Sequence, residues 1–319
     1  MKRSRRENKT NYSQYSYVPV HFYSKGKDGN MIFYTLNDYL VFYTLFCTEA
    51  ARRHGKIISA CIMPNHFHYL EITRDGAEAI RGIAVLERKF AAAYNSEYHR
   101  SGQNLFISTS GKAAKRTAKS TKSCIIYIYN NPVAGKLTRS ATGYRWNTLR
   151  YGLSGHPFTG KPDRSKSRNA FRRSLSLVDD IHKSGRPINY AAMRMIFRNL
   201  TPEETDQITD YIINIYNIID YNEVCKLFGS VQEAAKAAEI VAGSEYDIKE
   251  DYENYSLYRH MSDAMEESGY RVNCMTIEKM ETAERHALAR HLYERTSASS
   301  RQICKFMHIN TDTYLDGKQ

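Results

Sequence analysis

The sequence predicts an α+β domain followed by an all-helical region, and three observations support this. The stretch "YSYVPVHFYSKG" (residues 15–26) alternates apolar and polar side chains, which is typical of a strand with one buried face. In residues 75–102, apolar side chains recur every three or four positions, which is typical of an amphipathic helix. Beyond residue 185 the chain becomes acidic and rich in helix-capping motifs. We therefore predict a basic flexible tail (1–14), an α+β domain (15–155), a basic linker (156–185) and a helical domain (186–319).

Two longer segments of the α+β domain have clear local signals. Residues 36–55 predict a helix, with Asn37 as its N-cap and Gly55 beyond its last turn. Residues 56–72 are rich in β-branched and aromatic side chains, and they predict one or two strands.

Two shorter segments complete this domain. The stretch "NLFIS" (104–108) predicts a short strand. The apolar run "SCIIYIYNN" (123–131) predicts a short helix that Pro132 ends, because proline cannot continue the hydrogen bonding of a helix.

The predicted helical domain carries two capping motifs. These are "TPEE" (201–204) and "SVQE" (230–233), and the second predicts a helix that ends near Gly243. The last pair of helices (282–319) resembles a helix-turn-helix, although an ordinary helical hairpin has the same pattern.

Positive charge is concentrated in one part of the chain. The net charge is +12, and between Gly111 and Arg173 the only acidic residue is Asp163. Such a segment is expected to bind a polyanion, and aromatic side chains within it offer faces on which unpaired bases can stack. For residues 161–173, a solvated linker is the alternative. The candidate DNA-binding residues are Lys112, Lys115, Arg116, Lys119, Lys122, Lys136, Arg145, Trp146 and Arg150.

The cysteine spacing and the absence of long apolar segments indicate where in the cell the protein acts. The six cysteines contain no Cys-x-x-Cys pair, which favours reduced thiols and argues against a zinc finger. No run approaches the roughly 18 apolar residues of a membrane span, and no apolar segment of a secretory signal follows the basic tail. We therefore expect a cytoplasmic protein associated with the nucleoid.

The stretch "ACIMPNHFHYLEI" (60–72) places His66 and His68 on one face of a strand, where both can bind one divalent cation. Two satisfied core histidines are the alternative. Tyr127 and Asn131 are four residues apart and share one face of a predicted helix, so they could present a nucleophile and an amide ligand together. From the spacing alone, an aromatic core helix is the slightly better interpretation.

Three motifs, "MPNHFH" (63–68), "YIYNNPVAGKL" (127–137) and "GYRWNTLRYG" (143–152), resemble those of single-tyrosine HUH transposases in order and approximate spacing. The REP-associated tyrosine transposases and related insertion-sequence enzymes are the most similar of these. The resemblance covers roughly residues 15–155. It departs from the family where relatives have "NPVRAGL", and where "TSGKAAKRTAKSTKS" (109–123) replaces a shorter run with what we expect to be a DNA-contacting loop.

The resemblance implies a ferredoxin-like antiparallel sheet and a transposase that acts on single-stranded DNA with a hairpin or repeat. It implies that His66 and His68, with Asn131 as a third ligand, bind Mg²⁺ or Mn²⁺. Tyr127 would attack a phosphate and form a 5′-phosphotyrosine intermediate, either in a monomer or in a homodimer. Exchange of one phosphoester for another needs no ATP, and "GHPFTGKP" (155–162) lacks the Ser or Thr of a nucleotide-binding loop.

Two other functions remain open at this point. One is a non-catalytic or domesticated DNA-binding regulator. The other is a metal-dependent phosphodiester hydrolase, in which the histidines activate water and Tyr127 is a core residue.

Overall fold

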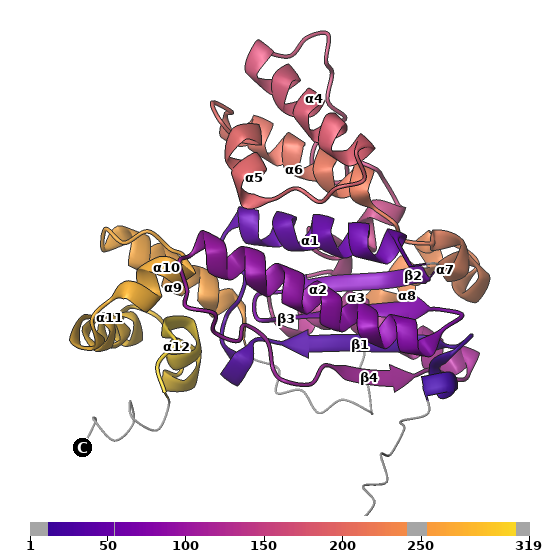
Figure 1. Cartoon of the computed structure of the whole chain (residues 1–319), viewed down its shortest axis with the longest axis horizontal. Helices are drawn as coiled ribbons and strands as arrows, with labels where there is room; N and C mark the ends of the chain where they lie inside the picture. Colours follow the sequence, from indigo (N-terminus) through magenta and orange to yellow (C-terminus); the bar gives the residue numbers. More distant parts are fainter. Residues whose placement is uncertain (1–11, 54, 241–253, 311–319) are drawn as a thin grey trace, which may run out of the picture.

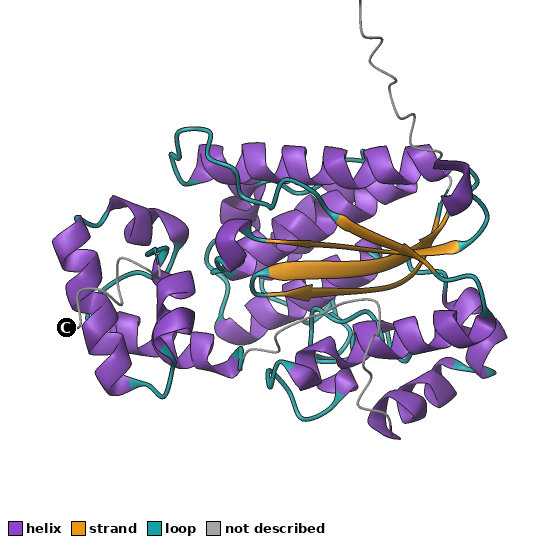
Figure 2. Ribbon diagram, turned by 90° about the horizontal axis from the view of Figure 1, so that it is seen from below, coloured by secondary structure: helices purple, strands orange, loops and turns teal. Residues whose placement is uncertain are grey.

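The computed structural model describes residues 12–53, 55–240 and 254–310, which form a sheet with helices on both faces (Figures 1 and 2). Parts of three predictions fall outside these residues: most of the basic tail, the helix end near Gly243, and the end of the helix-turn-helix candidate (282–319). No helix in the described part is both long enough and apolar enough to cross a membrane.

Within the described residues, the sheet has four strands: β1 (Pro19–Lys25), β2 (Lys56–Met63), β3 (His66–Ile72) and β4 (Gly111–Ala114). Their spatial order is β2-β3-β1-β4, and each neighbouring pair is antiparallel. β1 and β2 are therefore parallel to each other, with β3 between them. In the same way, β3 and β4 are parallel, with β1 between them. Helices connect both of these pairs, because parallel strands cannot be joined by a tight turn. The predicted α+β class with an antiparallel sheet is confirmed.

The two faces of the sheet carry different side chains. Phe67 and Tyr69 of β3 pack against Phe42 and Phe46 on one face. His68 points to the opposite face, since successive side chains of a strand alternate. The pairs Tyr23 with His68 and Cys61 with His68 extend this second face across β1 and β2.

Helices α1 (Leu36–Ala51) and α2 (Gly76–Glu97) cover the first face. The predicted N-cap of α1, Asn37, is wrong. Thr35 caps the helix instead, because its side chain accepts the Asp38 N–H while the Asp38 carboxylate accepts the Thr35 N–H. Asp75 caps the N-terminus of α2, because its carboxylate accepts two backbone N–H groups of the first turn.

Helix α3 (Ala118–Ala134) covers the second face and is longer than the predicted helix 123–131. Its capping box of Thr117 and Ser120 lies in the segment predicted to be a loop. Pro132 does not end the helix: it lies in the last turn, where only one backbone hydrogen bond is lost. The predicted strand 104–108 also differs, since Phe106 makes only an isolated bridge and the fourth strand is β4.

The predicted linker 156–185 contains a helix. This helix, α4 (Asn169–Lys183), packs with α5 (Tyr190–Ile196) and α6 (Pro202–Tyr216) on the outer side of α1 (Figure 1). Phe171, Leu175 and Val178 of α4 are buried at helical spacing. The basic, polar face of α4 accounts for the linker-like composition.

The rest of the chain is helical and forms two groups. α7 (Tyr221–Phe228) and α8 (Val231–Ile240) pack near β2 and α3. The second group lies at the opposite end of the molecule (Figure 1) and comprises α9 (Ser256–Glu267), α10 (Cys274–Lys279), α11 (Thr282–Arg295) and α12 (Ser300–Met307). Short 3-10 helices span Tyr12–Tyr15, Lys27–Gly29, Ala141–Gly143 and Arg150–Gly152.

The two hydrophobic cores cross the predicted domain boundary. One joins the α1–α2 face of the sheet to α4, α5 and α6, and the other joins α3 and the second face to α7 through α12. Residues 186–319 are therefore divided between both cores. The capping box of Thr201 and Glu204 at the start of α6 is present as predicted.

Replacing Phe171 with alanine is expected to lower the free energy of unfolding by about 3–5 kcal/mol, because the ring is buried and its loss leaves a cavity. Urea denaturation followed by circular dichroism measures this change. Arg173→Ala, on the exposed face of the same helix, is the matched control and should change the free energy by less than about 0.5 kcal/mol. Equal stability of the two variants would show that residues 169–183 behave as the predicted linker.

Candidate active site

Strand β3 places His66 and His68 on the sheet face that α3 covers. Both side chains are buried, with 2% and 1% of their surface exposed. Phe67, between them, packs on the opposite face with Phe42. The rings of the two histidines meet edge to face, with their centroids 4.9 Å apart. The predicted arrangement of the pair on one face is therefore present.

A neighbouring amide orients the His66 ring. Its Nδ1 lies 2.7 Å from Oδ1 of Asn65, and the amide of Asn65 is itself held because Nδ2 donates to the carbonyl of Gly29. Since Oδ1 can only accept, Nδ1 of His66 carries the hydrogen. The other nitrogen, Nε2, lies 3.1 Å from Oδ1 of Asn131. An imidazole lone pair and an amide oxygen thus converge, as two ligands of one cation do, unless the amide of Asn131 turns to donate.

A third histidine, from β1, orients His68. Nε2 of His21 lies 3.0 Å from Nδ1 of His68. Burial lowers the pKa of His68 well below its ordinary value, and the nearby His66 lowers it further. His68 is therefore neutral near pH 7, the form in which imidazole binds a metal.

Helix α3 brings Tyr127 and Asn131 to the same place. The Tyr127 ring meets His68 edge to face at a centroid distance of 5.4 Å and meets His21 at 5.7 Å. Asn131, one turn later, reaches His66. The predicted set of His66, His68, Tyr127 and Asn131 therefore lies together between β3 and α3.

The two imidazoles favour a divalent transition-metal ion, whereas the amide oxygen is a ligand type that Mn²⁺ and Mg²⁺ prefer. Asn65 and His21 play the part of the outer hydrogen-bond partners that metal-binding histidines usually have. Two imidazoles and one amide leave several coordination positions for water and for phosphate oxygens.

The segment leading into α9 covers this site. The ring of Tyr255 lies over His66 at a centroid distance of 5.7 Å, and its backbone N–H donates to the carbonyl of Gly135, just beyond α3. On the α8 side, the side chain of Asn130 donates to the carbonyl of Ala238. Because Tyr127 is only 1% exposed, a DNA phosphate cannot reach it in this conformation.

The candidate DNA-binding residues fall into two groups. Arg116, Lys119, Lys122 and Lys136 are exposed near the two ends of α3, and Lys112 and Arg150 are partly exposed. The remaining three, which are less available to DNA, are Lys115, Arg145 and Trp146.

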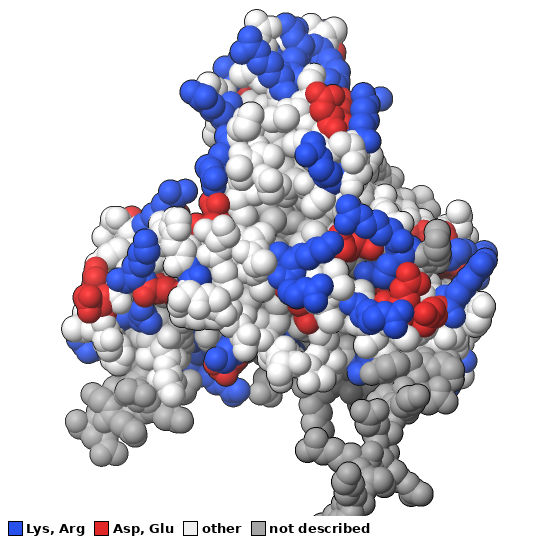
Figure 3. Space-filling view, viewed as in Figure 1, with Lys and Arg blue, Asp and Glu red and all other residues white. Residues whose placement is uncertain are grey.

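Each of these three side chains is occupied within the fold. Lys115 is 1% exposed, so it does not offer its charge to DNA here. Arg145 forms an ion pair with Asp206 of α6 at 2.6 Å, and Trp146 stacks on Tyr39 at 4.5 Å. On the face shown in Figure 3, Lys and Arg side chains gather at the end of the molecule formed by α4, whereas elsewhere they are interleaved with acidic side chains.

Two contributors to the site were not predicted from the sequence. His21 lies in the predicted strand 15–26. The alternation of side chains along that strand does not reveal which strand pairs with it, so the contact with His68 could not be predicted. Tyr255 is more than 180 residues from His66, and no local pattern connects them.

No protein-family model matches the chain, and no curated protein matches it. A solved structure of a REP-associated tyrosine transposase bound to a REP hairpin is similar to part of it. The two chains are 16% identical, the match covers 51% of this chain and 93% of that chain, and the TM-score is 0.37. A TM-score this low does not establish a shared fold, so the site is interpreted from its own residues.

Proposed function

We propose that the chain is a metal-dependent endonuclease and strand transferase for single-stranded DNA, of the single-tyrosine HUH transposase type. The observation that carries the proposal is the meeting of His66, Asn131 and Tyr127 at the contact between β3 and α3, with His68 between them. The order of the three sequence motifs supports it, and so does the strand order β2-β3-β1-β4, which suits a ferredoxin-like scaffold.

His66, His68 and Asn131 would hold Mg²⁺ or Mn²⁺. When bound, the ion polarises a phosphate oxygen as a Lewis acid. Asn65 keeps the hydrogen of His66 on Nδ1, so that Nε2 is left as a ligand atom.

Tyr127 supplies the attacking oxygen. In the proposed reaction its Oη forms a bond to phosphorus and the bond from phosphorus to the 3′-oxygen breaks, which leaves a 5′-phosphotyrosine and a free 3′-hydroxyl. The phenol loses one proton and the released 3′-oxygen gains one. A tyrosine has an ordinary pKa of about 10, so it needs help to lose its proton at neutral pH. The ring of His21, which is not a proposed ligand, meets the ring of Tyr127, so His21 is the candidate group to assist this proton loss.

The exposed basic residues suggest where the DNA backbone lies. Lys119 and Lys122 are exposed in the first turns of α3, and Lys136 is exposed just beyond its end. A strand bound along α3 would contact both ends and pass the tyrosine. The family resemblance further suggests a hairpin or repeat as substrate, and action as a monomer or a homodimer.

In the described conformation the site is covered, so under this proposal it represents a closed state that must open before DNA binds. Tyr255 and the start of α9 must move away before DNA enters, because every member of the site is almost fully buried. The backbone bond from Tyr255 to Gly135 ties this cover to the end of α3.

Tyr127→Phe is expected to abolish a covalent adduct between the protein and a labelled single-stranded DNA hairpin, because the attacking oxygen is gone. The adduct is measured on a denaturing gel after incubation with Mn²⁺ or Mg²⁺. Tyr129→Phe, two residues away on the same helix and equally buried, is the matched control and should retain the adduct.

Other outcomes of the same gel identify the alternatives. Salt-sensitive binding without any adduct in the unmodified protein would indicate a regulator. Cleavage that survives Tyr127→Phe would indicate a hydrolase.

His21→Ala is expected to weaken Mn²⁺ binding by about 10–100-fold, because His68 loses the partner that orients its ring. Isothermal titration calorimetry measures the affinity, and the signal belongs to this site if His66→Ala removes it. His260→Ala, an exposed histidine of α9, serves as the control. An unchanged Mn²⁺ affinity in His21→Ala would mean that His21 does not orient a ligand.

Tyr255→Ala is expected to increase the initial rate of adduct formation, since it removes the ring that covers His66. The rate is followed by quenching the reaction with denaturant at successive times. Tyr293→Ala, an exposed tyrosine of α11, should leave the rate unchanged. A slower reaction in Tyr255→Ala would show that this ring assists the site rather than closing it.

A further inference from the structure

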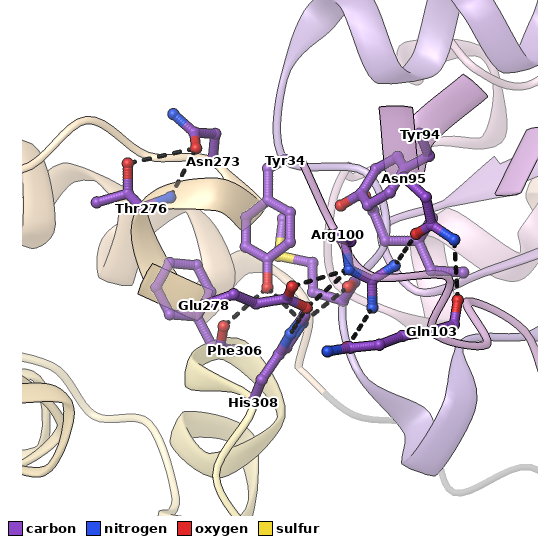
Figure 4. A network of polar contacts seen from close by, with 12 residues as sticks. Tyr34, Tyr94, Asn95, Arg100, Gln103, Asn273, Thr276, Glu278, Phe306 and His308 are labelled. Carbon is purple, nitrogen blue, oxygen red and sulfur yellow. Dashed lines mark hydrogen bonds and ion pairs between the residues drawn. The ribbon is translucent and has the colours of Figure 1, made fainter. Parts of the chain in front are cut away.

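A second cluster of potential ligand atoms lies far along the chain from His66, where α10 and α12 meet the segments that flank α1 and α2 (Figure 4). Cys274 and Glu278 are one turn apart on α10, and His308 directly follows α12. The ligand atoms of these three residues all lie within 4.8 Å of one another. Thiolate, carboxylate and imidazole are the three ligand types that Zn²⁺ takes in proteins.

Hydrogen bonding determines which nitrogen of His308 faces the cluster. Nε2 lies 2.9 Å from Oη of Tyr34 and 3.3 Å from the carbonyl of Met31. The Tyr34 hydroxyl donates to the carbonyl of Phe306, so its oxygen acts as an acceptor toward Nε2. Both partners of Nε2 are therefore acceptors, and Nε2 carries the hydrogen.

The other nitrogen of His308 then presents a lone pair to a carboxylate. Nδ1 lies 3.3 Å from Oε1 of Glu278. Two acceptors at this distance repel each other unless a proton or a cation lies between them. The left-handed backbone of His308 (φ 53°), rare for a residue other than glycine, holds the ring in this position.

Arg100 already neutralises part of the charge of Glu278. Its Nε lies 2.9 Å from each carboxylate oxygen, and its guanidinium also contacts Asn95 and Gln103. This contact is compatible with a metal, because carboxylates that bind metals are commonly hydrogen-bonded on their outer side. Cys274, the third member of the cluster, is fully buried.

We propose that Cys274, Glu278 and His308 form a binding site for a single Zn²⁺ ion. Cys274 supplies Sγ as a thiolate, whose proton is released to solvent on binding, Glu278 supplies Oε1, and His308 supplies Nδ1. A cavity of about 340 Å³, lined by Glu278 and His308 but not by Cys274, adjoins these two ligands and has room for a water ligand. The bound ion would link α10 to the end of α12.

This site does not depend on the proposed activity at Tyr127, and the two can fail separately. The alternative is an ion-paired network without a metal, in which a protonated His308 donates to Glu278 and Cys274 remains a thiol. The two cases differ in whether the sulfur binds the added ion.

Cobalt binding to the full-length, chelator-treated protein under reducing conditions tests the proposal. Co²⁺ replaces Zn²⁺ in such sites, and its bond to a thiolate gives a charge-transfer absorption that oxygen and nitrogen ligands do not give. We expect this absorption to appear on addition of Co²⁺ and to be displaced by Zn²⁺. It should be lost in Cys274→Ser and retained in Cys225→Ser, the matched control at a partly exposed cysteine outside the cluster.

Further variants separate this site from the candidate active site. His308→Ala is expected to weaken or remove the absorption, whereas His66→Ala should leave it intact. Absence of the absorption in the unmodified protein, or its survival in Cys274→Ser, would overturn the proposal. Because the first of these results needs no variant, a failure of Cys274→Ser to fold does not prevent the test.

Discussion

The packing of α3 against the face formed by β2 and β3 is the interaction on which the candidate active site depends. Asn147 holds the two together: its Nδ2 donates to the carbonyls of Tyr129 and Ala141, and its Oδ1 accepts the N–H of Leu149. Tyr144 adds a hydrogen bond to the carbonyl of Ile62 in β2. A helix that slipped by one turn would move about 5.4 Å and separate Asn131 from His66. The motif "GYRWNTLRYG" thus has a structural role, because it sets the position of the helix that carries the tyrosine.

Burial determines the chemistry of the histidines. An imidazole removed from water must find hydrogen-bond partners, and those available here are directional: Asn65 for His66 and His21 for His68. The same burial keeps His68 neutral. Oriented rings, one of them held neutral, are suited to binding a cation, but the same cover leaves both histidines almost without exposed surface. In the described conformation the candidate site is therefore assembled but closed to solvent.

The helices that cover the site are held by polar contacts as well as by an apolar core. Tyr34, before α1, and Arg100, after α2, reach His308 and Glu278 of the terminal group. Gln302 of α12 also donates to the carbonyl of Asn254, next to Tyr255. A cation bound between α10 and α12 would strengthen the group that supports this cover. The two proposals are therefore connected. The first concerns the candidate active site, and the second concerns a metal site in the helices that keep the active site covered.

Periodicity and capping motifs were enough to predict the α+β class, the β3 histidines on one face, the Tyr127–Asn131 face of α3 and the start of α6, because these features depend on residues close together in the chain. Local patterns failed where distant contacts outweighed them. Pro132 does not end α3, and α4 occupies part of the predicted linker. The pairing of His21 with His68 and the cover by Tyr255 were decided only by the tertiary structure, because strand order and helix docking bring together residues that no sequence period relates.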